Sequence, residues 1–451
     1  MRVSKSFRLY EKLLSTEKLH KCMIYAPVVS TNHPKAFFRP IAGKNFLEGL
    51  YDCRGNIPRS LIDEDNWKFL CREVSSGSPV EIAAPRVANV DGKIHAIGYF
   101  DPENDRIAVF HTIRRQFHTI PPIDGSYWRQ KVERAHQQRI DVGLLYSGNS
   151  AYRLIHGAAD GIPGLLVDVF GNSCHIKIRH DGPLLGALHA VYAFLCVRGV
   201  EKLWIEYAKH NRHAFFGNEF LNPVFHENGV QMCIRQTVKN STQDIFHFDN
   251  RLRAVRALLQ TMSQDRHALD IFSGEGFAAM ALLHGSPRSV MALESRPEKR
   301  MQLRRIEGLS NSDTLEFPEF ERMSTYVAEL DSEGFQLVHC SIPDNLKEAI
   351  ARDDKEVSEE KFLSKLIYHG MRCCAPNGYF VVSGACLMIP AHELGINVLE
   401  LIQRASVKLL RPVKQLRYIQ PGPDIPTTSF RCSGLEKEST PSAVGYVFKL
   451  D

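Results

Sequence analysis

From about residue 240 to the C-terminus, apolar runs typical of strands alternate with segments whose apolar positions recur at helical spacing. The runs predict strands at 268–272, 289–294, 335–341 and 378–386, and helices at 249–262, 276–285, 296–308 and 358–374. Such alternation is typical of a doubly wound, mostly parallel sheet. We therefore expect an α/β fold with a Rossmann-like domain over residues 238–451.

The N-terminal part has a different pattern. Short apolar runs at 80–90, 94–100 and 106–113 are separated by Gly, Pro, Asp and Asn, which predicts a small β-barrel over residues 24–115. Residues 123–145 carry apolar positions at helical spacing with many charges between them, which predicts a surface helix.

A compact α+β domain is predicted over residues 116–237, which include that helix. Its elements are strands at 164–171 and 174–180 around a Gly-Asn turn, a helix at 183–199, and strands at 202–208 and 229–238. The expected order is therefore strand-strand-helix-strand-strand.

The composition is that of a globular protein, with 44% hydrophobic and 24% charged residues among 451. No apolar run approaches the ~20 residues that span a bilayer, so a membrane protein is excluded. The eleven cysteines are scattered and lack C-x₂-C spacing. We expect free thiols in a reducing compartment and no metal site.

Positive charge is concentrated at the N-terminus, where residues 1–60 hold eleven Lys/Arg against four acids. Residues 1–23 are therefore interpreted as a basic extension. An RNA-binding arm, an organelle import signal and a solvated tail all fit this charge. The basic, Ser-containing start favours a mitochondrial location, with the cytoplasm as the alternative.

The segment "DIFSGEGF" forms a glycine turn between a predicted strand and helix. Gly274 and Gly276 allow the backbone to approach a ligand, while the dinucleotide motif G-x-G-x-x-G is absent. The segment resembles the first motif of class I methyltransferases, which bind S-adenosylmethionine. The resemblance implies cofactor contacts from Asp270, Phe272, Ser273, Gly274, Gly276 and Phe277.

Glu294 ends the next predicted strand, where an acid can accept hydrogen bonds from both ribose hydroxyls of that cofactor. The alternative is a tight turn followed by a surface glutamate without a ligand. The pattern favours the cofactor-binding fold over this alternative.

The stretch "YRLIHGAADGIPGLLVDVFGN" at 152–172 is the most specific in the chain. It resembles the R-L-x-x-x-E-x-D-G-L-P-G-L-x-V-D-x-Y-G-D signature of the bacterial rRNA cytosine-5 methyltransferases that modify large-subunit RNA. This resemblance implies a PUA domain, a central α+β domain and a C-terminal class I methyltransferase domain, in the order predicted above. Further segments similar to the family are 225–230, 249–251, 422–430 and 445–450.

The resemblance also implies catalytic residues. Cytosine C5 methylation needs a thiolate that attacks C6 of a flipped-out base. The family's cysteine follows the fifth strand, and Cys386 lies about one residue from that position. A small buried core residue is the alternative for Cys386. Glu321 matches the acid expected at the adenine.

Other motif positions depart from the family. Its D-P-P after the fourth strand corresponds here to Ser341, Ile342 and Pro343, with Asp344 three residues beyond Ser341. Its G-Q-K-T-G-F-F-L-D-Q-R motif corresponds to "VKNSTQDIFHF" at 238–248, which has lost both glycines. Together with the displaced cysteine, these departures make three altered places, which are hard to combine with efficient catalysis.

Three hypotheses follow. The first is a protein that binds large-subunit ribosomal RNA and pre-ribosomal particles during ribosome biogenesis, with lost or weakened methyl transfer. The second is an active S-adenosylmethionine-dependent rRNA methyltransferase that uses Cys386. The third is a protein-interaction scaffold without an RNA role. The sequence favours the first.

Overall fold

A computed structural model describes most of the chain. The described residues are 34–37, 56–83, 94–112, 122–145, 148–208, 212–216, 223–233, 248–304, 313–343, 346–353, 357–388, 396–422, 424–425 and 443–451. The expected basic extension at 1–23 and most of the 238–248 segment lie outside them. The chain forms two compact units, which are Met1–Leu221 with Asn240–Gln243 and Pro426–Lys437, and Asn222–Lys239 with Asp244–Ile425 and Glu438–Asp451.

The first unit begins with a five-stranded sheet of order β1-β3-β4-β5-β2. Its strands are β1 (Lys35–Phe37), β2 (Asn56–Pro58), β3 (Pro79–Ala83), β4 (Ile94–Asp101) and β5 (Arg106–Thr112). Helix α4 (Glu64–Glu73) buries Trp67 and Leu70, and Trp67 meets Phe100 edge-on at 5.1 Å between ring centroids. The three expected strand segments are confirmed within the described residues, while a PUA identity stays a prediction.

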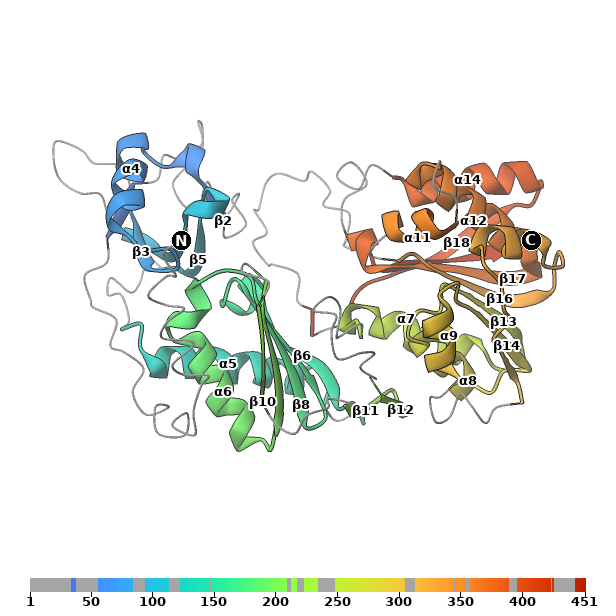
Figure 1. The fold of residues 1–451 in the computed structure, drawn as a ribbon, viewed down its shortest axis with the longest axis horizontal. Coiled ribbons are helices and arrows are strands. Elements are labelled where there is room, and N and C mark those ends of the chain that lie inside the picture. Colours follow the sequence, from blue (N-terminus) through green and yellow to red (C-terminus); the bar gives the residue numbers. More distant parts are fainter. Residues whose placement is uncertain are drawn as a thin grey trace. The chain divides into compact units, whose positions relative to one another are not determined.

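A second five-stranded sheet in this unit has the order β10-β9-β8-β7-β6. Its elements are α5 (Gly125–Asp141), β6 (Ala151–His156), β7 (Leu165–Phe170), β8 (Ser173–Ile178), α6 (Ala187–Val197), β9 (Lys202–Tyr207) and β10 (Arg212–Phe216). Strands β8 and β9 are parallel, because helix α6 carries the chain back across the sheet between them. Figure 1 shows α5 and α6 beside this sheet.

The expected strand at 229–238 is not part of this sheet. Strand β12 (Val230–Cys233) pairs instead with β11 (Val224–Glu227) in a separate hairpin of the second unit. The reason is the turn Asn228-Gly229, whose φ angles of 52° and 80° match a two-residue hairpin turn with both central residues left-handed. Strands β6 and β10 complete the central sheet, and the sequence interpretation had missed both.

The second unit contains a seven-stranded sheet of order β15-β14-β13-β16-β17-β19-β18. Its strands are β13 (His267–Ile271), β14 (Ser289–Leu293), β15 (Leu315–Glu316), β16 (Phe335–Ser341), β17 (Cys374–Ser383), β18 (Val413–Ile419) and β19 (Gly445–Leu450). The sheet is parallel from β15 to β17, and β19 is antiparallel to both of its neighbours. The strand order reverses between β13 and β16, which is where an open α/β sheet binds its ligand.

Helices cover both faces of this sheet (Figure 1). They are α7 (Arg253–Met262), α8 (Phe277–His284), α9 (Pro297–Leu303), α10 (Met323–Glu329), α11 (Leu346–Asp353), α12 (Glu359–Cys373) and α14 (Val398–Leu409). Residues of α7 and α8 share one core with Val381 and Val447, while α12 and α14 share another with Phe380 and Phe448. The class I methyltransferase-like fold predicted for this domain is therefore confirmed.

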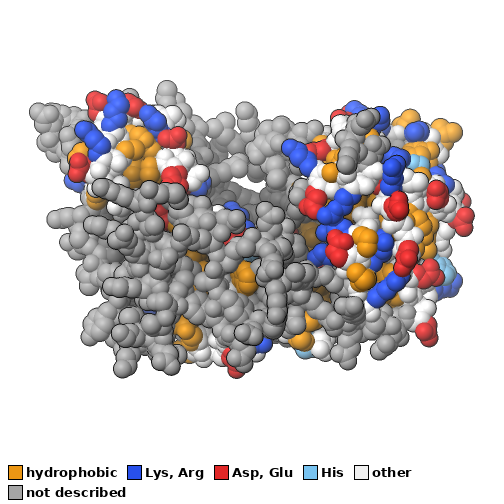
Figure 2. Space-filling model, viewed as in Figure 1, with side chains coloured by type: hydrophobic (Ala, Val, Ile, Leu, Met, Phe, Trp, Pro, Cys, Tyr) orange, Lys and Arg blue, Asp and Glu red, His pale blue; other side chains and the backbone are white. Residues whose placement is uncertain are grey.

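Two surface properties complete the description. Figure 2 shows basic and acidic side chains interspersed over the visible face of the second unit, without a large area of one sign. None of the described helices combines the length and the apolar character that crossing a bilayer requires.

Candidate functional site

The glycine turn leaves β13 through three left-handed residues. Phe272, Gly274 and Gly276 have φ angles of 62°, 56° and 82°. Gly276 donates its N–H to the Ser273 carbonyl at 2.8 Å, and α8 begins at the next residue. A left-handed bulky residue such as Phe272 is uncommon and costs free energy, so the surrounding packing must hold this turn in place.

The aromatic side chains of the turn contribute to the core. Phe277 is buried and meets Phe248 edge-on at 4.8 Å between centroids. Phe272 is partly buried and lies 6.2 Å from the Phe362 ring. Both residues were expected at the cofactor, and their ring contacts in the structure are with other side chains of the protein.

Asp270 lies in a hydrogen-bonded chain that crosses three strands. It is completely buried, and its carboxylate accepts from the Ser273 hydroxyl at 2.8 Å. Its other oxygen lies 2.7 Å from Nδ1 of His339 on β16. Nε2 of His339 lies 2.8 Å from the hydroxyl of Ser383 on β17. Both oxygens of Asp270 therefore have protein partners, and the sequence interpretation had not identified His339 or Ser383.

Glu294 follows β14 and is 1% exposed. Its carboxylate accepts from the Gly274 N–H at 3.1 Å, as expected for an acid that faces the turn. Arg296 donates to it from the backbone N–H at 2.9 Å, from Nε at 2.8 Å and from Nη2 at 2.8 Å. Burial alone would lower the pKa of Arg296, but the hydrogen bonds and charge of Glu294 raise it.

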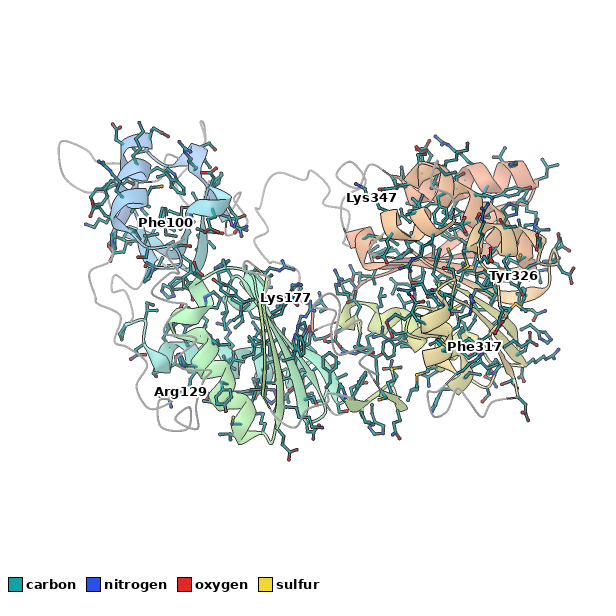
Figure 3. All side chains as sticks on the ribbon, in the orientation of Figure 1. Phe100, Arg129, Lys177, Phe317, Tyr326 and Lys347 are labelled. Atoms are coloured by element: carbon teal, nitrogen blue, oxygen red, sulfur yellow. The ribbon has the colours of Figure 1, made fainter. Side chains whose placement is uncertain are left out.

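Arg300 joins the end of β14 to the segment that contains Glu321. It donates to the Glu294 carbonyl at 2.9 Å and to the Phe320 carbonyl at 2.8 Å, and its guanidinium lies 5.4 Å from the centre of the Phe320 ring. Tyr326 stacks on Phe320 at 4.6 Å, and Figure 3 labels it in this region. Glu321 itself is exposed. Arg300 therefore connects the end of β14 to the segment that contains Glu321, the residue expected at the adenine.

The edge that the family resemblance implies to be catalytic, called the catalytic edge below, lies at the ends of β16 and β17. Ser341 is the last residue of β16, and Ile342 donates its N–H to the Ser383 carbonyl at 2.7 Å. Cys386 is half-buried in the short helical turn after β17. A Cβ atom built on Gly384 would lie 3.1 Å from Cβ of Ile342 and 3.2 Å from Sγ of Cys386. Cys386 is thus placed beside the altered D-P-P position, while Asp344 lies outside the described residues.

Three other cysteines of this domain are fully buried. Burial raises the pKa of Cys340 to about 12, with a contribution from Asp270, and raises the pKa of Cys374 to about 12. Burial raises the pKa of Cys373 to about 11. Thiolates are disfavoured at these positions, so they are structural residues.

A buried, charge-balanced cluster connects three of the family-like segments. Glu227 of β11 accepts from Arg256 at 2.5 Å and from Arg253 at 3.2 Å, and Arg253 also donates to Asp424 at 2.7 Å. Asn250 accepts from Arg253 at 2.9 Å. Two cations thus face two carboxylates, all nearly or completely buried. The segments at 225–230, 249–251 and 422–425 are therefore joined through this buried cluster in the second unit.

The signature at 152–172 is likewise explained by ion pairs. Arg153 binds both oxygens of Asp168 at 2.8 Å each. Arg139 of α5 binds both oxygens of Asp160 at 2.6 and 2.8 Å, and both of these side chains are almost completely buried. The motif fixes α5 against β6 and the turn after it.

The described residues fit S-adenosylmethionine in two respects. Among the described residues, a side chain on Gly274 would meet only the Phe272 carbonyl oxygen, at 3.9 Å, so these residues leave space beside the turn. Glu294 is an acid of the right type, held by the backbone of the same turn. Before Glu294 could accept hydrogen bonds from the ribose hydroxyls of the cofactor, Arg296 would have to release at least one oxygen of the Glu294 carboxylate. In the part of the chain that the structure describes, no group of three or more His, Cys, Asp or Glu is arranged to hold a metal ion.

Comparison with known proteins gives relatives in one functional class. No protein-family model matches the chain. The chain is 26% identical to the ribosomal RNA large subunit methyltransferase I of Pseudoalteromonas atlantica over 179 residues, which are 36% of this chain and 43% of that protein. It is 26% identical to the enzyme of that name from Cronobacter sakazakii over 200 residues, 41% of this chain and 48% of that protein. The matches therefore span less than half the length of these two curated relatives.

Two solved structures share the fold over nearly the whole chain. One is a SAM-dependent methyltransferase from Streptococcus mutans, with a TM-score of 0.66, 15% identity, and coverage of 92% of this chain and 99% of that chain. The other is a methyltransferase in complex with SAH, with a TM-score of 0.68 and the same identity and coverage. At this identity the comparison establishes the fold alone.

Proposed function

We propose that this protein binds large-subunit ribosomal RNA and acts in ribosome biogenesis, with lost or weakened methyl transfer. The large-subunit rRNA methyltransferases to which the chain is similar support the RNA-binding part. The ion pair between Arg296 and Glu294 carries the part that concerns methyl transfer. In this pair Arg296 binds the carboxylate that should accept hydrogen bonds from the cofactor ribose. The acid, Glu294, is 1% exposed. A cofactor must therefore displace a bidentate, charge-assisted interaction before it can bind.

The catalytic edge supports the same proposal. Ser341 stands where the family places the carboxylate of its D-P-P motif, so the described edge has a hydroxyl in place of an ionised acid. Ile342 is buried and bonded to β17, which fixes its backbone against the sheet. The scaffold keeps its core while the chemistry at its edge is altered.

S-adenosylmethionine remains the cofactor that suits this fold, and when bound it would supply an electrophilic methyl group. The backbone from Phe272 to Gly276 would contact it, and Glu294 would accept from its ribose. The Arg296–Glu294 pair weakens the binding of this cofactor and does not select a different one.

A second candidate function is that of an active rRNA methyltransferase. It is favoured by the position of Cys386, half-buried at the end of β17 beside Ile342. It is also favoured by the curated relatives, which are large-subunit rRNA methyltransferases. A mitochondrial location stays a prediction from the basic N-terminus under both candidates.

One experiment separates the candidates. The purified full-length protein is titrated with S-adenosylmethionine by calorimetry, and then incubated with ribosomal RNA and methyl-labelled cofactor. We expect recovery of large-subunit RNA after crosslinking, weak cofactor binding and no label that depends on Cys386. Micromolar cofactor binding together with label that Cys386→Ala abolishes would establish the active enzyme instead. Crosslinking that recovers no RNA would overturn both.

A further inference from the structure

The outer strand of the C-terminal sheet is unusually open. Strand β18 has seven residues, and those from Lys414 to Tyr418 are exposed. Leu416 and Tyr418 have exposed fractions of 46% and 48%, which is high for large apolar residues in a sheet. Exposed apolar side chains on an edge strand are a recognised mark of an interaction site.

Cationic side chains gather on one face of this edge. Val447 packs in the core beneath α7, so Lys449, two residues further along β19, points to the same face. Lys414 is directly opposite Lys449, and Arg417 is directly opposite Val447. The three cations therefore lie on the face that α7 covers.

Within the described part of the chain, these cations have no acidic partners. None of the three forms an ion pair with any residue that the structure describes. Like charges directly opposite each other on neighbouring strands are destabilising, and Lys414 and Lys449 are such a pair. An anionic ligand would remove this repulsion.

A groove lies beside the cations, between β18 and α7. Its volume is about 500 Å³. It is lined by Ala254, Leu258, Leu416, Arg417, Tyr418, Ile419 and Gln420. Apolar walls with a few polar groups at the rim suit an unstacked base, since bases of single-stranded RNA bind by stacking and apolar contact.

The groove leads toward the catalytic edge. Strand β18 is antiparallel to β19, and β19 is antiparallel to β17, so β18 runs in the same direction as β17. Ile419 is in register with Gly445, which is in register with Ser383. The end of the groove is therefore two strand spacings, about 10 Å, from Ser383 along the sheet. Cys386 follows Ser383 by three residues.

We propose that the groove between β18 and α7 binds a single-stranded RNA segment that flanks the nucleotide at the catalytic edge. Lys414, Arg417 and Lys449 contact its phosphates, and a base occupies the groove. This inference rests on the proposed RNA-binding function and names the surface that carries it. An acidic peptide added to the edge as a further strand is disfavoured, because the ladder of β18 is interrupted by a bulge between Gln415 and Arg417.

The test compares the full-length protein with K414Q/R417Q/K449Q. Fluorescence anisotropy measures binding of a labelled single-stranded RNA from the large subunit at several salt concentrations. Each phosphate contact adds roughly 0.7 to the slope of log affinity against log salt, so three contacts lower the slope by about 2. The counterion contribution alone then weakens binding roughly 40-fold at ~0.15 M salt.

The control variant is K347Q/K361Q/K408Q, which removes the same charge from α11, α12 and α14 on the opposite face. Figure 3 labels Lys347 on α11. We expect this variant to keep the affinity of the unmodified protein, and ultraviolet crosslinks to map to β18 and α7 rather than to these helices. Circular dichroism melting confirms that each variant is folded.

Three results would overturn the inference, and they differ. If the unmodified protein binds the RNA and K414Q/R417Q/K449Q binds it equally well, the groove assignment fails while the proposed function stands. If the unmodified protein binds no RNA, both fail. Competition by an acidic peptide with crosslinks outside β18 would assign the edge to a protein partner instead.

Discussion

Arg296 holds both carboxylate oxygens of Glu294, at 2.8 Å from Nε to Oε1 and 2.8 Å from Nη2 to Oε2. The two residues are separated by one position just beyond β14, so the pair is local to this turn. The Arg296 side chain is 28% exposed, whereas that of Glu294 is 1% exposed. The cation is therefore the partner that can move outward when a ligand approaches.

Replacing this cation should increase cofactor affinity. In Arg296→Gln the carboxylate of Glu294 is free to accept from ribose hydroxyls without breaking a charge-assisted pair, which is worth about 1.5–3 kcal/mol. We expect S-adenosylmethionine to bind about tenfold more tightly by calorimetry. Arg304→Gln, which removes an exposed partner of Glu319, should leave the affinity unchanged. Weaker binding by Arg296→Gln would mean that the arginine itself contacts the cofactor.

The charge-balanced cluster predicts that removing one of its carboxylates strongly lowers the free energy of unfolding. Glu227→Gln leaves Arg253 and Arg256 buried against one carboxylate, which should lower the free energy of unfolding by about 3–5 kcal/mol. Adding Arg256→Met restores the charge balance and should recover part of that loss. Glu319→Gln breaks an exposed pair and should cost less than about 1 kcal/mol.

Because of where the tryptophans lie, the loss of stability can be assigned to one of the two units. All three, Trp67, Trp128 and Trp204, belong to the first unit. Urea unfolding followed by circular dichroism should therefore change for Glu227→Gln, while the transition followed by tryptophan fluorescence stays in place. A shift in the fluorescence transition alone would contradict the assignment of Glu227 to the second unit.

The hydrogen-bonded chain from Asp270 through His339 to Ser383 predicts that His339→Ala lowers the free energy of unfolding more than Ser383→Ala does. His339→Ala removes a partner from the buried carboxylate and from the buried hydroxyl, and should destabilise the second unit by about 3–5 kcal/mol. Ser383→Ala leaves only one ring nitrogen without its partner and should cost about 1–3 kcal/mol. Chemical unfolding of both variants, followed by circular dichroism, checks the order. Equal losses would mean that the contact of His339 with Asp270 contributes nothing beyond its contact with Ser383.

The stability of the first unit should fall in mild acid. Burial, together with the charge of Arg153, lowers the pKa of His156 from 6.5 to about 3. The unfolded chain then binds a proton below pH 6.5 that the folded unit does not, so stability present above pH 6.5 is lost as the pH falls toward 3. The loss from this group is about 1.4 kcal/mol per pH unit.

Tryptophan fluorescence during urea unfolding measures this loss at several pH values. His156→Gln should reduce the slope of stability against pH between 6 and 4, because the variant has no group that titrates there. An unchanged slope would show that another group, such as His136 with its pKa lowered to about 4 chiefly by burial, is responsible.

Strong periodicity made much of the C-terminal fold predictable. The strands that end at Ile271, Leu293 and Ser341 are apolar runs buried between helices, and the glycines of the turn are visible in the sequence because only a few residue types tolerate a left-handed backbone. Strand β18 was not predicted, because its exposed residues carry no apolar alternation.

The hydrogen-bond partners of the two acids at the site could not be predicted from the sequence. Asp270 and Glu294 were recognised from their positions at strand ends, but His339 and Arg296, which occupy their carboxylates, follow no motif. One of these contacts depends on the register of β13 with β16, which pairs Asp270 with His339. Register is fixed only when the sheet assembles. The Asn-Gly turn of the β11–β12 hairpin is visible in the sequence, and it is the signal that separates β12 from the central sheet.

The buried cluster around Glu227 determines where the protein can be cut. Arg253 reaches Asp424 across 171 positions of the chain, and both arginines depend on a glutamate that precedes the Rossmann-like sheet. A fragment that begins at residue 248 would enclose two guanidinium ions with a single carboxylate. The smallest C-terminal piece able to fold by itself must therefore begin upstream of the β11–β12 hairpin, and proteolytic cleavage just after that hairpin should leave the two pieces associated.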